Sequence, residues 1–162
     1  MTNHRSFIRS VSVFAVLTMA LGLGLQGDAA AQAGAKAARK APPLELPAYQ
    51  LPRPNDVVRQ TYQFAADHPE VLMYMPCFCG CNRSGHTSNV DCFVKSRAQN
   101  GDVTAWQEHG AVCAMCLAVG ETAMRMYAAG SSVKDIRAEI ERKYASPAAN
   151  EYRTATPAVP AK

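Results

Sequence analysis

The chain has 162 residues, a formal net charge of +4 and six cysteines. Its basic residues are scattered rather than gathered in a stripe with interleaved aromatic side chains, so the charge pattern gives no support to nucleic-acid binding. The length and composition are those of one modest globular domain with flanking segments.

The N-terminal residues have the three parts of a secretory signal peptide. Two basic residues, Arg5 and Arg9, precede an apolar run over residues 11–25, and three alanines follow at 29–31. We predict that residues 1–31 are a cleaved signal peptide and that the mature protein is exported to the periplasm or the extracellular space.

The apolar run is short for a membrane span, so we expect no stable membrane span after cleavage. A retained N-terminal anchor is the alternative interpretation. The chain has no cysteine before Cys77, so we expect no lipid attachment at the cleavage site. Removal of residues 1–31 takes away Arg5, Arg9 and Asp28, which lowers the formal charge to +3.

Composition divides the remaining chain into three parts. Residues 32–54 are rich in alanine and proline and lack apolar periodicity, which indicates a flexible linker. Residues 146–162 have a similar composition and are predicted to form a disordered tail. A cysteine-rich domain over residues 55–145 lies between them.

Helical patterns dominate this domain. Asn55 is a candidate cap for a first helix, and Pro69 is placed to begin a second short helix that ends at Pro76. A loop rich in glycine, asparagine and serine follows, then a short helical or extended segment over residues 90–97 and a turn at Asn100-Gly101.

The second half of the domain contains two longer helical patterns. Apolar residues recur at helical spacing between residues 111 and 130, where Gly130 supplies a stop. Ser132 and Asp135 form a capping pair for a last helix. The predicted fold is all-α, a small bundle of about four helices whose cysteine-rich loop packs against the helix that carries a CxxC pair.

The six cysteines fall into two groups. Cys77, Cys79 and Cys81 alternate along the loop and would point the same way in an extended chain, and Cys92 follows eleven residues later. Cys113 and Cys116 are three residues apart, which places them on one face at the start of a helix. The spacing predicts that both groups can face a single acceptor.

A metal ion fits this pattern best. Thiolates bind Cu(I) and Zn(II). The six cysteines and two nearby histidines supply eight donors, which would suffice for two tetrahedral zinc ions. Nearby thioethers at Met73, Met75 and Met115 favour copper, although these methionines also suit ordinary core packing. The predicted metal ligands are Cys77, Cys79, Cys81, Cys92, Cys113 and Cys116, with His86 and His109 as further candidates.

Two other uses of the cysteines remain open. An even number of cysteines in a small exported domain is typical of a disulfide-stabilised scaffold, here a helical interaction domain. The pair Cys113 and Cys116 also has the spacing of thiol–disulfide redox proteins, but no strand leads into it as in a thioredoxin-like fold. No catalytic residue is predicted, and we expect a protein that is not an enzyme.

The run Pro76-Cys77-Phe78-Cys79-Gly80-Cys81 resembles the signature of the PCYCGC-motif proteins, with Phe78 in place of the usual tyrosine. The resemblance continues through residues 86–89, 91–93 and 109–116, and on to 126–127, 132–133 and 136–137. This family is bacterial and largely exported, and many of its members resemble lipoproteins, whereas this chain lacks the acceptor cysteine. The resemblance implies one exported cysteine-rich domain and is consistent with a metal-binding role.

These observations together predict an exported protein that binds Cu(I) or Zn(II) through a thiolate cluster. Its role would be metal buffering, delivery or resistance. Its partners would be the metal ion and a metal-transport protein or cuproprotein.

Overall fold

The computed structural model describes residues 39–161, which belong to one compact unit, so the predicted signal peptide lies outside the described residues. Within this range the chain forms six α-helices, two short 3-10 helices and two strands. The helices are α1 (Asn55–Asp67), α2 (Pro69–Leu72), α3 (His109–Val112), α4 (Ala114–Ala128), α5 (Val133–Tyr144) and α6 (Pro147–Asn150). The 3-10 helices are η1 (Cys81–Ser84) and η2 (Asn89–Cys92), and the strands are β1 (Val94–Arg97) and β2 (Val103–Trp106).

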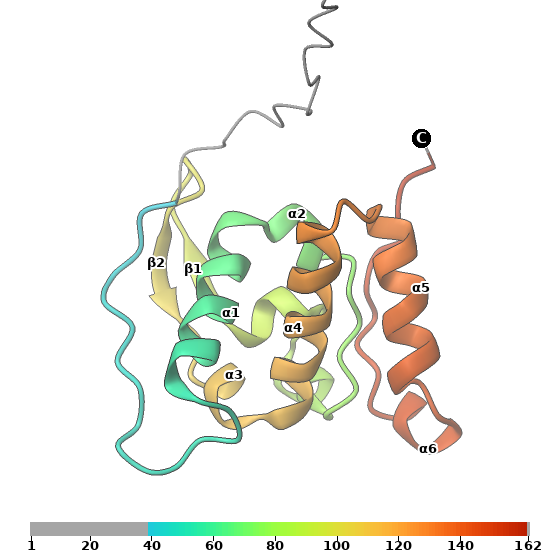
Figure 1. Ribbon diagram of the computed structural model, residues 1–162, viewed down its shortest axis with the longest axis horizontal. Coiled ribbons are helices and arrows are strands. Elements are labelled where there is room, and N and C mark those ends of the chain that lie inside the picture. Colours follow the sequence, from blue (N-terminus) through green and yellow to red (C-terminus); the bar gives the residue numbers. More distant parts are fainter. Residues whose placement is uncertain (1–38, 162) are drawn as a thin grey trace, which may run out of the picture. The chain divides into compact units, whose positions relative to one another are not determined.

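Helix α4 is the centre of the fold, with α1 on one side and α5 on the other (Figure 1). The contact with α1 is close, since a Cβ added at Gly120 of α4 would lie 2.6 Å from Cγ2 of Thr61. From α5, the side chains of Ile136 and Ile140 are fully buried. The apolar stripes of these three helices therefore supply the main core, as their helical periodicity predicts.

Local signals place several helix ends as expected. Pro69 is the first residue of α2, and the Ser132 hydroxyl accepts a hydrogen bond from the Asp135 amide at the start of α5. The first helix differs in detail from the prediction. Asn55 is its first helical residue rather than its cap, and the Pro54 carbonyl accepts the first hydrogen bond, from the Val58 amide.

The prediction of an all-α fold is wrong in one respect, because β1 and β2 form an antiparallel hairpin. The predicted turn at Asn100-Gly101 joins the two strands, and Gly101 has a positive φ of 88°. Each strand has only four residues, and the register shifts twice along the pair. Strands this short and irregular do not produce the alternating pattern by which a sequence reveals a strand.

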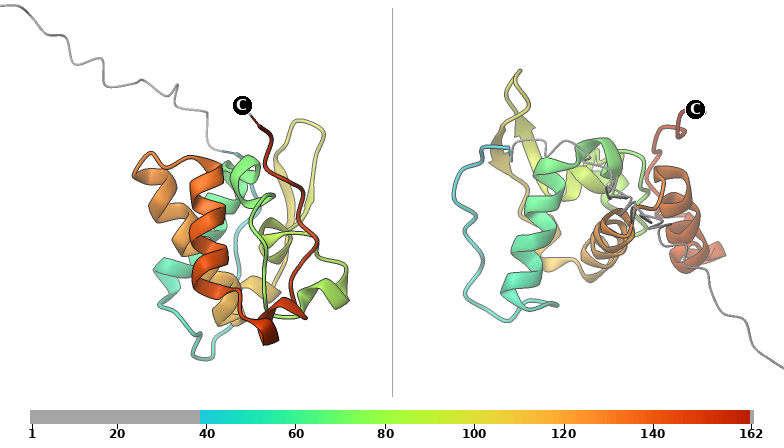
Figure 2. Two further views of the ribbon diagram at one scale, coloured as in Figure 1. Left: turned by 90° about the vertical axis from the view of Figure 1, so that its right-hand side faces the viewer. Right: turned by 45° about the horizontal axis from the view of Figure 1, so that its top comes forward.

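The chain on either side of the predicted domain also contacts it. In residues 39–54, the Lys40 carbonyl accepts a hydrogen bond from the Val103 amide and the Pro42 carbonyl accepts one from the Trp106 indole. In the views of Figure 2, residues 146–161 return along the body of the molecule after α5, and Thr154 among them is buried. The compositions that favoured a flexible linker and a disordered tail did not reveal these contacts.

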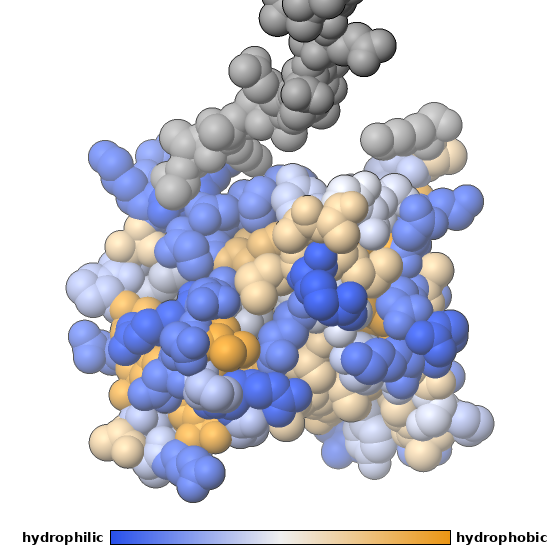
Figure 3. Space-filling view, in the orientation of Figure 1, coloured by the Kyte–Doolittle hydropathy of each residue, from blue (hydrophilic) through white to orange (hydrophobic). Residues whose placement is uncertain are grey.

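On the face drawn in Figure 3, hydrophilic residues are interspersed with small apolar patches. Among the described residues, none of the helices combines the length and the apolar character needed to cross a bilayer.

Candidate metal centre

All eight predicted donor residues lie in one connected cluster. They come from three parts of the chain: the loop between α2 and β1, helix α3, and the start of α4. The cluster comprises four overlapping groups in which all donor atoms lie within 4.8 Å of one another. These groups are Cys79–His109–Cys113–Cys116, Cys77–Cys79–Cys81, Cys77–Cys92–Cys116 and Cys81–His86–Cys92.

The sulfur atoms are separated by distances that suit a metal ion. The sulfurs of Cys77, Cys79 and Cys116 form a triangle with 3.5 Å on each side. Two ligand sulfurs of a tetrahedral zinc ion lie about 3.8 Å apart, given a zinc–sulfur bond of about 2.3 Å. A disulfide bond is about 2.05 Å long, and all six cysteines, each within residues 39–161, are free thiols in this structure.

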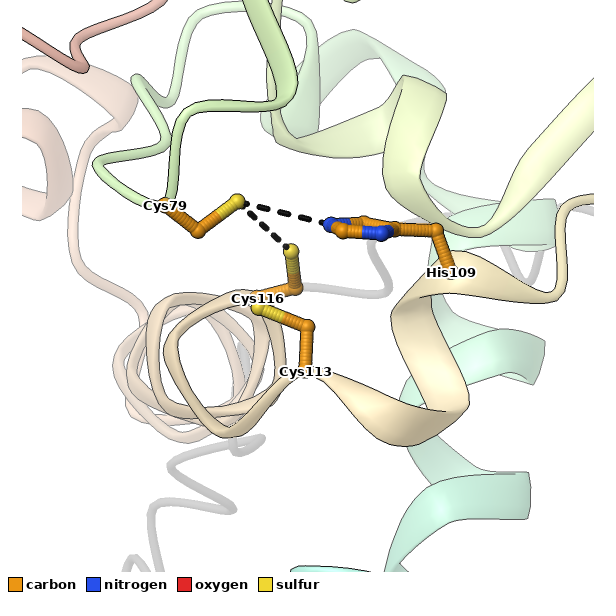
Figure 4. A group of neighbouring side chains, drawn as sticks. All are labelled: Cys79, His109, Cys113 and Cys116. Carbon is orange, nitrogen blue, oxygen red and sulfur yellow. Dashed lines mark hydrogen bonds between the residues drawn. The ribbon is translucent and has the colours of Figure 1, made fainter. Parts of the chain in front are cut away.

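One of the four groups contains four donors, and Figure 4 shows how they lie. The Cys79 sulfur projects from the loop toward the His109 imidazole of α3 and the Cys116 sulfur of α4, each at 3.5 Å. Cys113 stands beside Cys116 at the start of α4. Three thiols and one imidazole thus lie close together. These four donors equal the ligand number of a tetrahedral ion.

Cys81, His86 and Cys92 form a second group. The Cys81 and Cys92 sulfurs are 3.7 Å apart, and Nδ1 of His86 lies 3.6 Å from the Cys92 sulfur. The other ring nitrogen of His86 lies 3.5 Å from the Gln107 amide nitrogen. A hydrogen bond there would leave Nδ1 free to face the sulfurs, as second-shell partners of ligand histidines do.

The CxxC pair differs from the prediction that both cysteines occupy one helix. Cys113 has extended backbone angles and separates α3 from α4, so it is the N-cap residue while Cys116 lies in the first turn. The break turns α3 so that His109 can reach the same cluster. Apolar periodicity runs through residues 111–130 without interruption, which is why the sequence did not reveal the break.

Two glycines allow the cluster to close. Gly80, between Cys79 and Cys81, has a left-handed backbone with φ of 87°, a conformation that glycine adopts without steric cost. Gly110 packs against η2 so closely that an added Cβ would lie 2.5 Å from the Cys92 carbonyl oxygen. That contact holds the neighbouring His109 close to the cysteine loop.

Two buried polar residues, Asn89 and Thr154, position the cluster, and neither was among the residues predicted for the site. The Asn89 side chain donates a hydrogen bond to the Cys116 carbonyl, and its backbone amide donates one to the Met75 carbonyl. Thr154 pairs with Cys77 twice, through its hydroxyl as acceptor and its amide as donor. The residue types carried no signal, since asparagine in a loop and threonine in a tail are usually exposed.

Close packing drives the thiol pKa values apart. A hydrogen bond from Cys116 lowers the pKa of Cys77 to about 4 and that of Cys81 to about 3. Hydrogen bonds from Cys113 and Cys116 lower the pKa of Cys79 further. The pKa of Cys116 is raised. The largest cause is its hydrogen bond with Cys113, and its hydrogen bonds with the loop thiols that ionise before it add to the effect. Crowded thiols thus share charge and protons, and a cation would replace the protons.

A family model for proteins of unknown function with the PCYCGC motif matches residues 28–158. The chain belongs to this family. The match extends through the cysteine cluster and into the C-terminal segment that holds Cys77. No curated protein and no solved structure matches the chain significantly.

For this member of the PCYCGC family, what the site can bind is therefore inferred from its geometry. Its cysteine and histidine groups could hold a metal ion, and the donor set is compatible with more than one metal.

Proposed function

We propose that this PCYCGC protein is exported and binds Cu(I) or Zn(II) through its thiolate cluster, without catalysing a reaction. Its function would be to buffer a metal, to deliver it to a metal-transport protein or cuproprotein, or to confer resistance to it. The metal ion is then the cargo of the protein rather than a cofactor for chemistry.

One observation carries the proposal, namely the convergence of eight donor atoms from distant parts of the chain. Cys77 and Cys116 are 39 residues apart in sequence, and their buried sulfurs are 3.5 Å apart. A core that needed only apolar contacts would gain nothing from six thiols and two imidazoles at ligand spacing. A metal ion supplies a physical reason, because it binds all of these groups at once.

The donor set suits two kinds of ion for different reasons. A group of three thiolates and one imidazole matches the tetrahedral sites that Zn(II) prefers. The excess of sulfur over nitrogen suits Cu(I), which is a softer ion. Both ions require deprotonated cysteines, so either would displace protons when it binds.

A disulfide-stabilised interaction domain is the competing function. The sulfurs of Cys77 and Cys116, and those of Cys81 and Cys92, are each close enough for a bond to form after a small movement. Such a protein would carry oxidised cysteines in the compartment where it works, while a metal-binding protein would carry thiolates.

Native mass spectrometry distinguishes these functions. The protein is isolated anaerobically from its own host, its bound metal is identified from the intact mass, and its thiols are alkylated and counted after denaturation. We expect bound copper or zinc and six alkylatable thiols. A metal-free chain lighter by six hydrogens would have three disulfides and would refute the proposal. Two oxidised and four free cysteines would instead indicate a redox protein.

A further inference from the structure

We infer that the cluster holds two metal ions in neighbouring subsites with unequal access to solvent. This inference rests on the proposed function and specifies how the same residues would divide between the ions. The outer subsite consists of Cys79, His109, Cys113 and Cys116. The inner subsite consists of Cys77, Cys81, His86 and Cys92.

The division follows from the distances between donors. Among residues 39–161, Cys79, His109, Cys113 and Cys116 form a group of four donors whose ligand atoms all lie within 4.8 Å of one another. Once these are assigned to one ion, the four remaining donors are also close together. Cys81, His86 and Cys92 form one group, and Cys77 lies within 4.8 Å of both Cys81 and Cys92.

Each subsite then has three cysteines and one histidine. That set is a common tetrahedral ligand set for zinc, so two ions would use all eight donors and leave none unpaired. A single ion could bind four of the donors and would leave the rest as crowded buried thiols. The two subsites adjoin each other at the Cys77 and Cys116 sulfurs, 3.5 Å apart.

The subsites differ in burial. In the outer subsite three of the four donors, Cys79, His109 and Cys113, are only partly buried, and Cys116 is 0% exposed. Val112 beside them is 45% exposed. In the inner subsite only His86 is partly buried, and the cysteines are 0% exposed at Cys77, 3% at Cys81 and 0% at Cys92. A chelator or a partner protein can therefore reach the outer ion directly, whereas the inner ion is shielded by the loop and by the C-terminal segment. The outer ion should exchange first.

The test uses Zn(II) as the probe and the full mature chain, reduced and loaded anaerobically. Native mass spectrometry counts the ions, and a chromophoric chelator in excess then records the rate at which each is removed. We expect two zinc ions per chain, released in two phases of equal amplitude.

A matched pair of variants assigns the phases. His109→Ala removes one ligand from the outer subsite and should accelerate the fast phase. His86→Ala makes the same change in the inner subsite and should accelerate the slow phase. Each substitution should lower the affinity for one ion by about tenfold or more. Removal of an outer-shell partner of a metal site already has an effect of this size. His68→Ala, at the junction of α1 and α2 and outside the cluster, is the control and should change neither phase.

The remaining outcomes distinguish failure of the two-ion inference from failure of the proposed function. One zinc ion, three or more, a single release phase, or the same phase altered by both histidine variants would each overturn the two-ion inference. A chain that binds Cu(I) in native mass spectrometry but takes up at most one Zn(II) would keep the proposed function and lose the inference. A chain that binds neither ion would lose both.

Discussion

At the scale of single residues, the site depends on where individual sulfur atoms point. Alternation along the loop and an i, i+3 spacing on the helix were enough to predict that the two cysteine groups face each other. Cys79 has the central position, since its sulfur lies 3.5 Å from the sulfurs of Cys77 and Cys116 and from the His109 imidazole. It is also only half-buried, so a polar replacement there changes packing less than it would at its neighbours.

We therefore predict that Cys79→Ser weakens metal binding by about tenfold or more while the chain stays folded, because serine keeps the size of the side chain and loses the thiolate. Competition titration with Zn(II) and with Cu(I) measures the change. Ser84→Ala, an exposed change in the same loop, is the control. A lower melting temperature with one unpaired thiol and unchanged metal binding would instead indicate a disulfide scaffold.

The buried hydroxyl of Tyr62 should make the stability of the fold depend on pH. Burial raises the pKa of its hydroxyl well above the ordinary value of 10, and the hydroxyl donates a hydrogen bond to the Gln107 carbonyl. A group whose pKa is raised by folding stabilises the fold fully below its unfolded pKa, and that stability is lost as the pH rises through and above it. Wild type should be more stable than Tyr62→Phe by about 1 kcal/mol at neutral pH.

Denaturant unfolding at a series of pH values measures this difference between wild type and Tyr62→Phe. Comparing the two chains cancels the titration of the other tyrosines and the lysines. The advantage of wild type should shrink as the pH rises above about 10, because the unfolded tyrosine then ionises and the buried one does not. A constant difference across that range would contradict the prediction.

At the scale of elements, α3 is the piece that completes the cluster. This single turn carries His109. It can pack closely against η2 because Gly110 has no side chain. An added methyl group would meet the Cys92 carbonyl and the Phe93 ring, both at 2.5 Å. Neither neighbour can move freely, since one is backbone and the other is a fully buried ring.

Gly110→Ala should therefore destabilise the domain by about 1–3 kcal/mol, because α3 must move away from the loop. For the same reason it should weaken the proposed metal binding by the donor group that contains His109. Gly120→Ala is the matched control. It overpacks the contact between α1 and α4 and should lower stability without changing the number of ions bound. Thermal melting and native mass spectrometry measure the two effects, and equal loss of metal in both variants would refute the specific role of α3.

At the scale of the whole molecule, the chain on both sides of the predicted domain takes part in the fold. The C-terminal segment contacts the site directly, since the Thr154 hydroxyl accepts a 2.9 Å hydrogen bond from the Cys77 amide. Both residues are buried, so water cannot replace a lost partner. The segment therefore acts as a brace behind the cysteine loop.

Thr154→Val should cost about 1–3 kcal/mol, because the buried Cys77 amide loses its acceptor while the shape of the side chain is kept. Thr156→Val makes the same chemical change two residues later. The buried hydroxyl of Thr156 has no hydrogen-bond partner among residues 39–161, so this control should be nearly neutral or stabilising. Chemical denaturation compares the two variants, and similar losses in both would show that Thr154 is not a brace.

Metal binding and folding should be coupled, because the ligands are brought together only in the folded chain. Free metal at about one hundred times its dissociation constant would stabilise the fold by about 2.7 kcal/mol. Removing the metal with a chelator under reducing conditions should thus lower the melting temperature by several degrees. Re-addition should restore it, and a melting temperature independent of metal would contradict the coupling.

Features that depend on neighbours in the chain could be predicted from the amino-acid sequence. Pro69 at a helix start, Ser132 as a cap and the Asn100-Gly101 turn follow from short-range geometry. Side-chain chemistry makes the six cysteines and two histidines candidate donors, and tertiary packing brings them together. Other features could not be predicted in this way: the helix break at Cys113, the pairing of two four-residue strands, and the contacts of Thr154 and Asn89 with the site. These features arise from packing between segments far apart in the chain, which no local pattern records.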